Sequence, residues 1–297
     1  KVDLVDAETL ELVELETKEL LAGSFLEGAP IIPASAISGM GLDRVRTVLH
    51  GIAAAHKARI AAGVVRLPVD RVFTVKGFGT VVTGTLVSGD IQLDMELDVL
   101  PQCKRVKVRG LQVHGDHEDM AVAGQRVAVN LTGMGLGELR RGQTIVTPEG
   151  LEVTRQFDAT MRLLPGVRSF KHGARIRCHH GTAEVMARVS LSALTSGSSK
   201  FLETQFLNTL EPGDEAFVRV RLEEPIALSR GDRFVVRAYS PPLTIGGGEV
   251  LDPIPPHGRL RSRRGRDRLQ RLRDALNLHD SVAVITEESG AWGISRS

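Results

Sequence analysis

The pattern of hydrophobic positions changes along the chain and separates four regions. In residues 1–62, apolar residues recur at helical spacing. Residues 8–21 read as an acidic helix and Ile31–Ile32 as a short buried strand, while Asp43 can cap a helix that continues to about residue 62. This first region therefore predicts alternating helix and strand.

Two further regions, residues 63–150 and 151–253, alternate apolar and polar positions with a period of two. The clearest examples are residues 105–109, 125–130, 216–222 and 233–237. Turn residues separate these strands, and the glycines at 246–248 are expected to interrupt a strand. Many short strands with regular turns predict two small β-barrels.

Pro253, Pro255 and Pro256 mark a linker at the start of the last region, residues 254–297. The sequence then becomes basic and afterwards helical, with leucines spaced along one helix face at 269, 272 and 276. We expect helices over residues 268–278 and 281–292, which would open a further module without completing it.

Composition adds few constraints on function. The 297 residues carry a formal net charge of only +2, so affinity for nucleic acid would have to come from local patches. Aromatic residues make up 4% of the chain, which argues against base stacking as the main grip on RNA. Two cysteines make no disulfide scaffold, and no apolar run approaches the length of a membrane span, so a reducing cytoplasm is the expected location.

The most informative stretch is residues 70–85, DRVFTVKGFGTVVTGT, which predicts a strand, a glycine turn and a second strand. It resembles the first hairpin of the second domain of translational GTPases, and most of all that of the selenocysteine-specific elongation factors (SelB). The resemblance implies a fold class: an α/β remnant of a P-loop GTPase domain (1–62), two all-β barrels like those of elongation factor Tu (63–150 and 151–253), and a linker with the start of a helical, winged-helix extension (254–297).

The same resemblance implies a function. Members of this family deliver selenocysteinyl-tRNA to the ribosome at the expense of GTP, with Mg²⁺ as the metal, and read an mRNA hairpin through the winged-helix modules. The expected partners are therefore selenocysteinyl-tRNA, the ribosome and that hairpin, with no membrane. Two other classes remain open: another translational GTPase that carries a different aminoacyl-tRNA, and a non-enzymatic RNA-binding barrel protein.

Two short segments resemble the guanine-binding loops of GTPases. Lys1 and Asp3 match the end of an Asn-Lys-x-Asp segment, whose carboxylate accepts hydrogen bonds from guanine, and Ser35 and Ala36 match the loop that reaches the base through backbone N–H groups. By itself, the Lys-x-Asp segment is better explained as a solvated surface turn, and Ser35 can be a simple loop serine. Their order along the chain favours a guanine pocket.

The phosphate-binding loop Gly-x-x-x-x-Gly-Lys-Ser/Thr does not occur in the 297 residues. That loop cradles the phosphates, and its lysine reaches the β and γ oxygens. We therefore expect the chain to be the C-terminal part of a GTPase, with no catalytic residue of its own and no activity alone, and GTP and Mg²⁺ to bind in the full-length protein.

The resemblance places Asp70, Arg71 and Arg126 in the aminoacyl pocket of the first barrel. A selenol is more acidic than a thiol, so selenocysteine is an anion at neutral pH, whereas its precursor serine is neutral. Arginines can favour the anion, and Asp70 can orient one of them. From the residues alone, an ordinary salt bridge at the end of a strand is the better explanation, and the family resemblance is what favours the pocket.

Cys178, His179 and His180 suggest a metal site at first sight, but zinc needs about four suitably spaced ligands and Cys103 is the only other thiol. We expect a β-turn and no metal here, because a similar turn recurs in the third domain of the family.

Many arginines follow the linker, and five of them are predicted to contact RNA: Arg261, Arg263, Arg264, Arg266 and Arg268. A solvated linker is the alternative for this run of charge.

Overall fold

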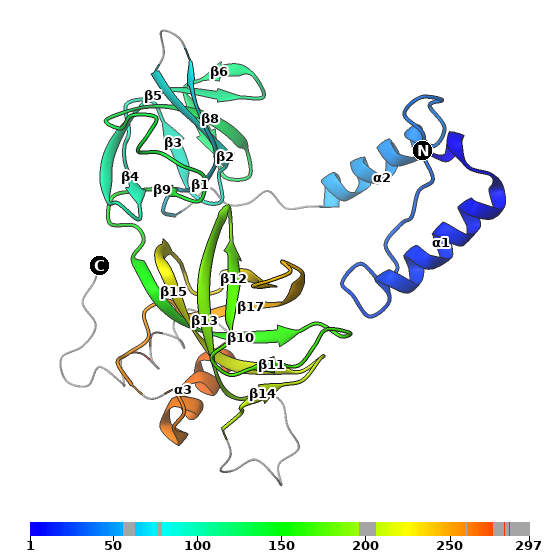
Figure 1. Ribbon diagram of the computed structural model, residues 1–297. Helices are drawn as coiled ribbons and strands as arrows, with labels where there is room; N and C mark the ends of the chain where they lie inside the picture. Colours follow the sequence, from blue (N-terminus) through cyan, green and yellow to red (C-terminus); the bar gives the residue numbers. More distant parts are fainter. Residues whose placement is uncertain are drawn as a thin grey trace. The chain divides into compact units, whose positions relative to one another are not determined.

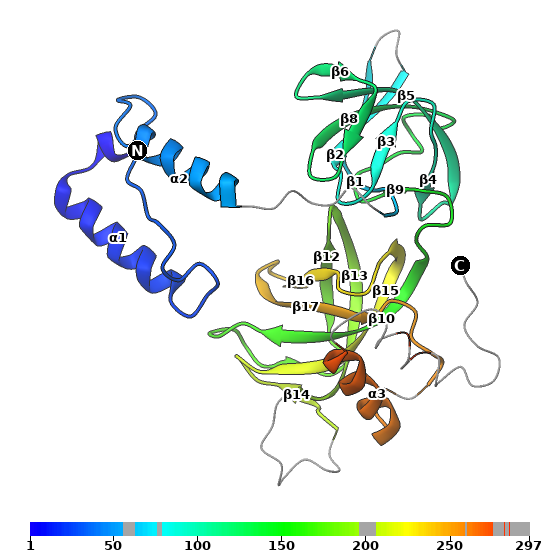
Figure 2. The ribbon, with the colours of Figure 1, turned by 180° about the vertical axis from the view of Figure 1, so that it is seen from behind.

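The computed structural model describes residues 1–55, 63–75, 79–195, 206–258, 260–275, 282 and 285. The chain divides into two compact units, Lys1–Arg59 and Ile60–Ser297. Figures 1 and 2 show the helices of the first unit in blue and the strands of the second from cyan to orange. Among the described helices, none is both long and apolar enough to cross a membrane.

The first unit consists of helices and loops. A short 3₁₀ helix, η1 (Val2–Leu4), precedes α1 (Ala7–Leu21) and α2 (Leu42–Ala55). Asp6 caps α1 by accepting a hydrogen bond from the Thr9 backbone N–H at 2.9 Å, which confirms the acidic helix. The strand predicted at Ile31–Ile32 is wrong, since residues 1–55 contain no strand with which it could pair. Asp43 lies inside the first turn of α2, and residues 56–62 fall outside the described residues.

The second unit begins with a barrel, as the alternating pattern predicts. Barrel 1 comprises β1 (Arg66–Val75), β2 (Gly79–Thr85), β4 (Glu96–Leu100), β5 (Lys104–Val113), β6 (Asp116–Glu118), β8 (Arg126–Thr132) and β9 (Thr144–Val146). The strand order is β4-β9-β1-β2-β8-β5-β6, and pairing of β4 with β5 closes the sheet. Two short strands, β3 (Asp90–Gln92) and β7 (Met120–Val122), pair separately. Its inward side chains are mostly valine and leucine, the residues that fit a pleated, buried surface.

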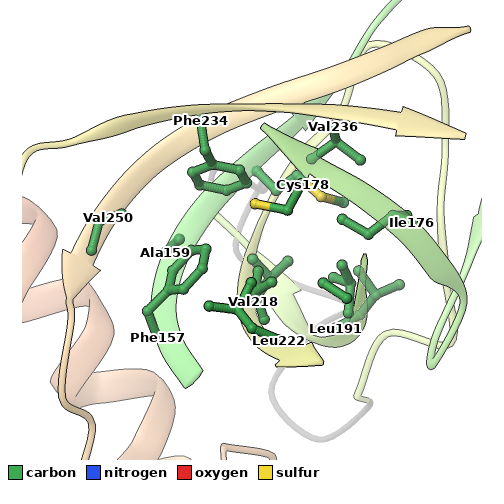
Figure 3. Packing of buried hydrophobic residues seen from close by; sticks show 14 of the residues in the cluster. Phe157, Ala159, Ile176, Cys178, Leu191, Val218, Leu222, Phe234, Val236 and Val250 are labelled. Carbon is green, nitrogen blue, oxygen red and sulfur yellow. The ribbon is translucent and has the colours of Figure 1, made fainter. Parts of the chain in front are cut away.

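Barrel 2 is a closed barrel in the order β10-β15-β13-β12-β16-β17. Its strands are β10 (Val153–Leu163), β12 (Arg175–His180), β13 (Ala183–Leu194), β15 (Glu215–Ala227), β16 (Arg233–Ala238) and β17 (Thr244–Asp252), and a separate pair is formed by β11 (Phe170–Lys171) and β14 (Thr209–Leu210). Figure 3 shows the interior, where the rings of Phe157 and Phe234 meet edge to face with centroids 5.2 Å apart.

The glycines at 246–248 lie inside β17, so the predicted interruption is wrong. The backbone of a neighbouring strand explains why these positions are glycine. A Cβ on Gly248 would lie 1.8 Å from the Thr160 carbonyl oxygen, and one on Gly246 would lie 2.3 Å from that of Arg162. Both residues belong to β10, which pairs with β17 in this barrel. Glycine here permits close approach of two strands instead of ending one.

A third helix, α3 (Arg263–Asp274), packs on the outside of barrel 2 (Figures 1 and 2). It begins before the predicted start at 268 because Ser262 caps it, accepting a hydrogen bond from the Gly265 backbone N–H at 3.0 Å. Leu269 and Leu272 are buried against Phe217 and Leu251 of the barrel. The helix predicted for residues 281–292 lies almost wholly outside the described residues.

Candidate functional site

Asp70 and Arg126, 56 residues apart in sequence, meet on the outer face of barrel 1. The Arg126 guanidinium donates to both Asp70 carboxylate oxygens, from Nη1 at 2.5 Å and from Nη2 at 3.2 Å. The Thr83 hydroxyl donates to Asp70 Oδ1 at 2.6 Å. Three adjacent strands, β1, β2 and β8, therefore supply one polar cluster.

Strand register explains how these side chains come together. β2 pairs with β1 on one side and with β8 on the other. The ladder between β1 and β2 shifts register between Val69 and Arg71, so Asp70 lies at a bulge. A β-bulge re-aims the side chain of the extra residue. Asp70 can thereby reach both Thr83 and Arg126 although its neighbour Val69 points into the barrel core.

The electrostatics of the cluster favour the charged forms. Burial acts to raise the pKa of Asp70, but hydrogen bonds from Arg126 and Thr83 outweigh it, so the pKa of that carboxyl lies below its usual value. The bond to Asp70 likewise raises the pKa of Arg126. The Arg126 side chain is still 53% exposed, and only two of its five N–H groups are used by Asp70. Arg71 is also exposed, so one net positive charge remains.

An apolar depression of about 240 Å³ lies on the same outer face. Phe73, Val81 and Asn130 occupy directly opposite positions on β1, β2 and β8 and line it, with Gln112 and His117 at its polar edge. The Asn130 side-chain oxygen is buried and has no hydrogen-bond partner among the described residues. The depression thus combines apolar walls with an available acceptor. Sequence reasoning missed it because the pocket depends on the register of several strands.

In the first unit, the predicted guanine-binding segments lie together. The backbone N–H of Val2 donates to the Ala34 carbonyl at 3.3 Å. Ser35 is 1% exposed, and its hydroxyl accepts from the backbone N–H groups of Ile37 and Ser38. A hydrogen bond from Ser35 lowers the pKa of Asp3. Lys1, Asp3 and Ala36 remain exposed beside it. The two segments therefore bring an exposed carboxylate next to a buried serine turn.

Barrel 2 presents arginines on its outer face in two rows. Arg188 on β13 lies directly opposite Arg175 on β12 and Arg221 on β15, and Arg177 on β12 lies opposite Arg237 on β16. We call these five residues the arginine face. Glu223 binds Arg175 through two hydrogen bonds of 2.8 and 2.7 Å, and Glu184 binds Arg177 at 2.6 Å.

Five arginines and two glutamates leave three net positive charges on the arginine face. Like charges directly opposite each other on neighbouring strands destabilise a sheet. A polyanionic ligand would offset that cost. The alternation Arg175-Ile176-Arg177 in the sequence already places two of these side chains on one face of a strand.

The predicted RNA-binding arginines divide into two groups. Arg268 is 8% exposed and pairs with Asp252, so the prediction that it contacts RNA is wrong: its guanidinium faces the barrel because the neighbouring Leu269 and Leu272 anchor that side of α3. Arg261 bonds to Asn208 at 2.9 Å and stacks on the Phe206 ring at 5.2 Å. Arg263 and Arg264 are exposed, and Arg266 is half-buried.

Cys178, His179 and His180 do not form a ligand set. The Cys178 side chain points into the core of barrel 2 (Figure 3), and burial raises the pKa of its thiol to about 12. His180 instead contacts Asp232 and Arg66. Within the part of the chain that the structure describes, no group of three or more His, Cys, Asp or Glu could hold a metal ion.

Each of the two barrels matches a known protein family. Residues 158–257 match the family described as selenocysteine-specific elongation factor, beta-barrel domain, and residues 79–146 match elongation factor Tu domain 2. The selenocysteine-specific elongation factor of Desulfomicrobium baculatum is 41% identical over 255 residues, which cover 86% of this chain and 38% of that protein. That of Methanocaldococcus jannaschii is 29% identical, covering 85% of this chain and 55% of that protein.

Solved structures give the same result. Translation elongation factor SelB from Methanococcus maripaludis, in its apo form, superposes with a TM-score of 0.72 and 25% identity over 86% of this chain and 57% of that chain. A second structure of that protein contains the GTP analogue GppNHp and is 26% identical. The chain spans 38% to 58% of the length of these relatives. The resemblance seen in the hairpin is confirmed: barrel 1 is similar to elongation factor Tu domain 2, barrel 2 is similar to the beta-barrel domain of selenocysteine-specific elongation factors, and the relatives named here are such factors.

Proposed function

We propose that this chain is the aminoacyl-tRNA-binding part of a selenocysteine-specific elongation factor, which delivers selenocysteinyl-tRNA to the ribosome at the expense of GTP. The observation that carries the proposal is the Asp70–Arg126 pair on the outer face of barrel 1. The pair is held in a fixed geometry, yet the arginine remains half-exposed and keeps free N–H groups. Such a group is a preformed receptor for an anion.

Selectivity for selenocysteine follows from charge. The selenol is ionised at neutral pH, while the smaller serine hydroxyl is neutral. Arg126, oriented by Asp70, would donate its unused N–H groups to the selenolate, and Arg71 would add a second positive charge nearby. A serine hydroxyl gains only an ordinary hydrogen bond from the same donors.

The rest of the tRNA would extend over both barrels. The apolar depression beside the pair can take the flat face of the terminal nucleotide, with Asn130 accepting a hydrogen bond from a base amino group or a ribose hydroxyl. The arginine face of barrel 2 would bind backbone phosphates, where its three net positive charges replace counterions. Sparse aromatic content fits this mode of binding, because phosphate contact requires no stacking.

The first unit would hold the nucleotide base. Asp3 would accept hydrogen bonds from guanine, Lys1 would pack along the base, and the Ser35–Ala36 turn would face its oxygen edge. GTP with Mg²⁺ supplies the free energy of delivery when bound and hydrolysed. The exposed arginines of α3, Arg263 and Arg264, would add contacts to RNA, and the region after residue 253 would lead to the modules that read the mRNA hairpin.

Replacing Arg126 by alanine in the full-length, GTP-bound protein tests the proposal. We expect affinity for selenocysteinyl-tRNA to fall about a hundredfold, since a desolvated charge-assisted bond supplies a few kcal/mol and 1.4 kcal/mol is about tenfold. Affinity for seryl-tRNA should stay nearly unchanged. Arg105→Ala, which removes a similarly exposed arginine that also pairs with a carboxylate in the same barrel, is the matched control. Equal losses for both tRNAs would show that Arg126 grips the RNA or supports the barrel, as in the two alternative classes of protein.

A further inference from the structure

A compact ion cluster joins the two barrels. Arg66 of β1, in barrel 1, donates to both carboxylate oxygens of Asp232 in barrel 2, from Nη1 at 2.8 Å and from Nη2 at 2.6 Å. His180, at the end of β12, places its Nε2 at 3.2 Å from Arg66 Nη2 and at 3.2 Å from Asp232 Oδ2. The imidazole can therefore accept from the arginine when neutral or donate to the carboxylate when protonated.

Water is largely excluded from this cluster. The side chains of Arg66, Asp232 and His180 are 11%, 17% and 11% exposed. A buried ion pair is favourable only when its geometry is maintained, and separating its members leaves an uncompensated charge. Asp232 is fixed further, since it accepts a hydrogen bond from the Ser229 backbone N–H at 2.8 Å. A change in the angle between the barrels that separated Arg66 from Asp232 would leave both charges unpaired.

Other contacts between the two barrels also depend on how the barrels are oriented. Gly181, which follows His180 and has a φ of +54°, lies against Pro68 of β1, so the turn approaches barrel 1 closely. Arg141 Nε donates to the Thr182 carbonyl at 3.3 Å. A small apolar cluster also joins Leu100 and Val146 of barrel 1 to Ala227 of barrel 2. The turn that resembled a metal site in the sequence is thus one of the segments of barrel 2 that contact barrel 1.

We infer that Arg66, Asp232 and His180 form a joint that holds the two barrels as one rigid body and so positions the arginine face relative to the Asp70–Arg126 pair. These three are positioning residues and contact no substrate. The inference rests on the proposed function for its consequence, namely that one RNA contacts both barrels. Two binding surfaces on a rigid frame bind one ligand with a high effective concentration, which is lost when the frame loosens.

The joint itself is tested without RNA. Spin labels are placed on cysteines at the exposed positions Glu118 of barrel 1 and Arg168 of barrel 2, after Cys103→Ser removes the exposed native thiol. We expect a narrow distribution of interspin distances in the otherwise unchanged chain and a broad one with Asp232→Asn. Asparagine has nearly the same shape as aspartate and keeps an oxygen that can accept the hydrogen bond from the Ser229 backbone N–H. The circular dichroism spectrum should therefore stay the same. Equal distributions would overturn the inference.

Binding tests the consequence in the full-length, GTP-bound protein. Asp232→Asn should lower the affinity for selenocysteinyl-tRNA about tenfold, because the two binding surfaces no longer act together. A short aminoacylated acceptor hairpin, which reaches only barrel 1, should bind within about twofold of the unaltered protein. The substitution removes a negative charge, so a simple electrostatic effect on RNA would have the opposite sign.

A reversible cross-link provides the rescue. A Cβ on Gly181 would lie 3.6 Å from the Pro68 Cβ, within the range of about 3.5–4.5 Å that a disulfide requires. Pro68→Cys with Gly181→Cys, in the Asp232→Asn and Cys103→Ser background, should regain tRNA affinity when oxidised and lose it when reduced. Failure of the cross-linked protein to recover, or equal losses for both RNAs, would overturn the positioning role. If the unaltered protein showed no preference for selenocysteinyl-tRNA, the proposed function would fail while the distance measurement still decided the joint.

Discussion

The arginine face of barrel 2 gives the most quantitative prediction. Arg188 and Arg221 lie directly opposite each other, both are exposed, and neither forms an ion pair among the described residues, whereas Arg175 is bound by Glu223. We therefore choose Arg188→Gln with Arg221→Gln. Each phosphate neutralised contributes about 0.7 to 0.9 to the slope of log affinity against log salt concentration, so the double variant should lose about 1.4 to 1.8.

That slope converts to an affinity. We take the electrostatic contribution to binding as negligible at roughly 1 M salt. At roughly 0.15 M salt, the lost slope then lowers the affinity about 15- to 30-fold, or by about 1.6–2 kcal/mol of binding free energy. The assay is fluorescence anisotropy of a labelled tRNA with the 297-residue chain over a series of salt concentrations. Arg44→Gln with Arg46→Gln, which removes the same charge from α2, is the matched control and should leave the slope nearly unchanged.

The stability of the double variant against unfolding should stay the same or rise, although its affinity for RNA falls. Because like charges opposite each other on neighbouring strands cost about 0.2–1 kcal/mol, the double variant should unfold at an equal or higher temperature. An unchanged salt slope, or the same loss in the α2 control, would refute the assignment of this face to RNA phosphates. A lower melting temperature with an unchanged slope would show that the two arginines serve the barrel alone.

Three further predictions concern stability, each measured by denaturant or thermal unfolding. Arg268→Met should lower the free energy of unfolding by roughly 3 kcal/mol, because it leaves the buried Asp252 carboxylate unpaired, and the exposed Arg264→Met should change little; equal effects would contradict a structural role for Arg268. Gly248→Ala should unfold or severely destabilise barrel 2, since its Cβ would lie 1.8 Å from the Thr160 oxygen, whereas Gly51→Ala in α2 meets nothing within 4 Å and should stabilise the chain; a folded Gly248→Ala protein would refute the packing argument. Hydrogen bonds from His180 and Arg66 outweigh the effect of burial and lower the pKa of Asp232, so its contribution to stability is present above the unfolded value of about 3.9 and lost as pH falls below it; Asp232→Asn should therefore flatten the loss of stability between about pH 4 and 2, and parallel curves would contradict this.

Local patterns predicted the barrels well, because alternation with period two is itself the physical requirement of a half-buried strand. The pattern was misleading where a residue's role depends on distant backbone. Glycines at 246–248 read as a strand break, but they belong to β17, where β10 and β16 approach too closely for any side chain. Ile31–Ile32 read as a strand, but a strand requires a partner that residues 1–55 do not supply.

Charge patterns were similarly ambiguous. The arginines after residue 258 all read as one basic run, yet Leu269 and Leu272 turn Arg268 inward to Asp252 and leave Arg264 exposed. Asp70 and Arg126 could be paired only through the family resemblance, since 56 residues separate them. The Arg66–Asp232 contact spans 166 residues and gave no local signal at all.

The central claim is that barrel 1 recognises a negative charge on the aminoacyl group. The most direct measurement uses cysteinyl-tRNA, because a thiol with a pKa of about 8.5 changes from neutral to anionic within an accessible range. Affinity of the full-length, GTP-bound protein for cysteinyl-tRNA should rise roughly tenfold between about pH 7 and 9, as the thiolate fraction increases. The affinity for seryl-tRNA, with serine on the same tRNA body, should show no such rise. The Arg126→Ala variant should show no rise with cysteinyl-tRNA or with seryl-tRNA. If cysteinyl-tRNA and seryl-tRNA followed the same pH dependence, charge recognition by Asp70, Arg71 and Arg126 would be contradicted.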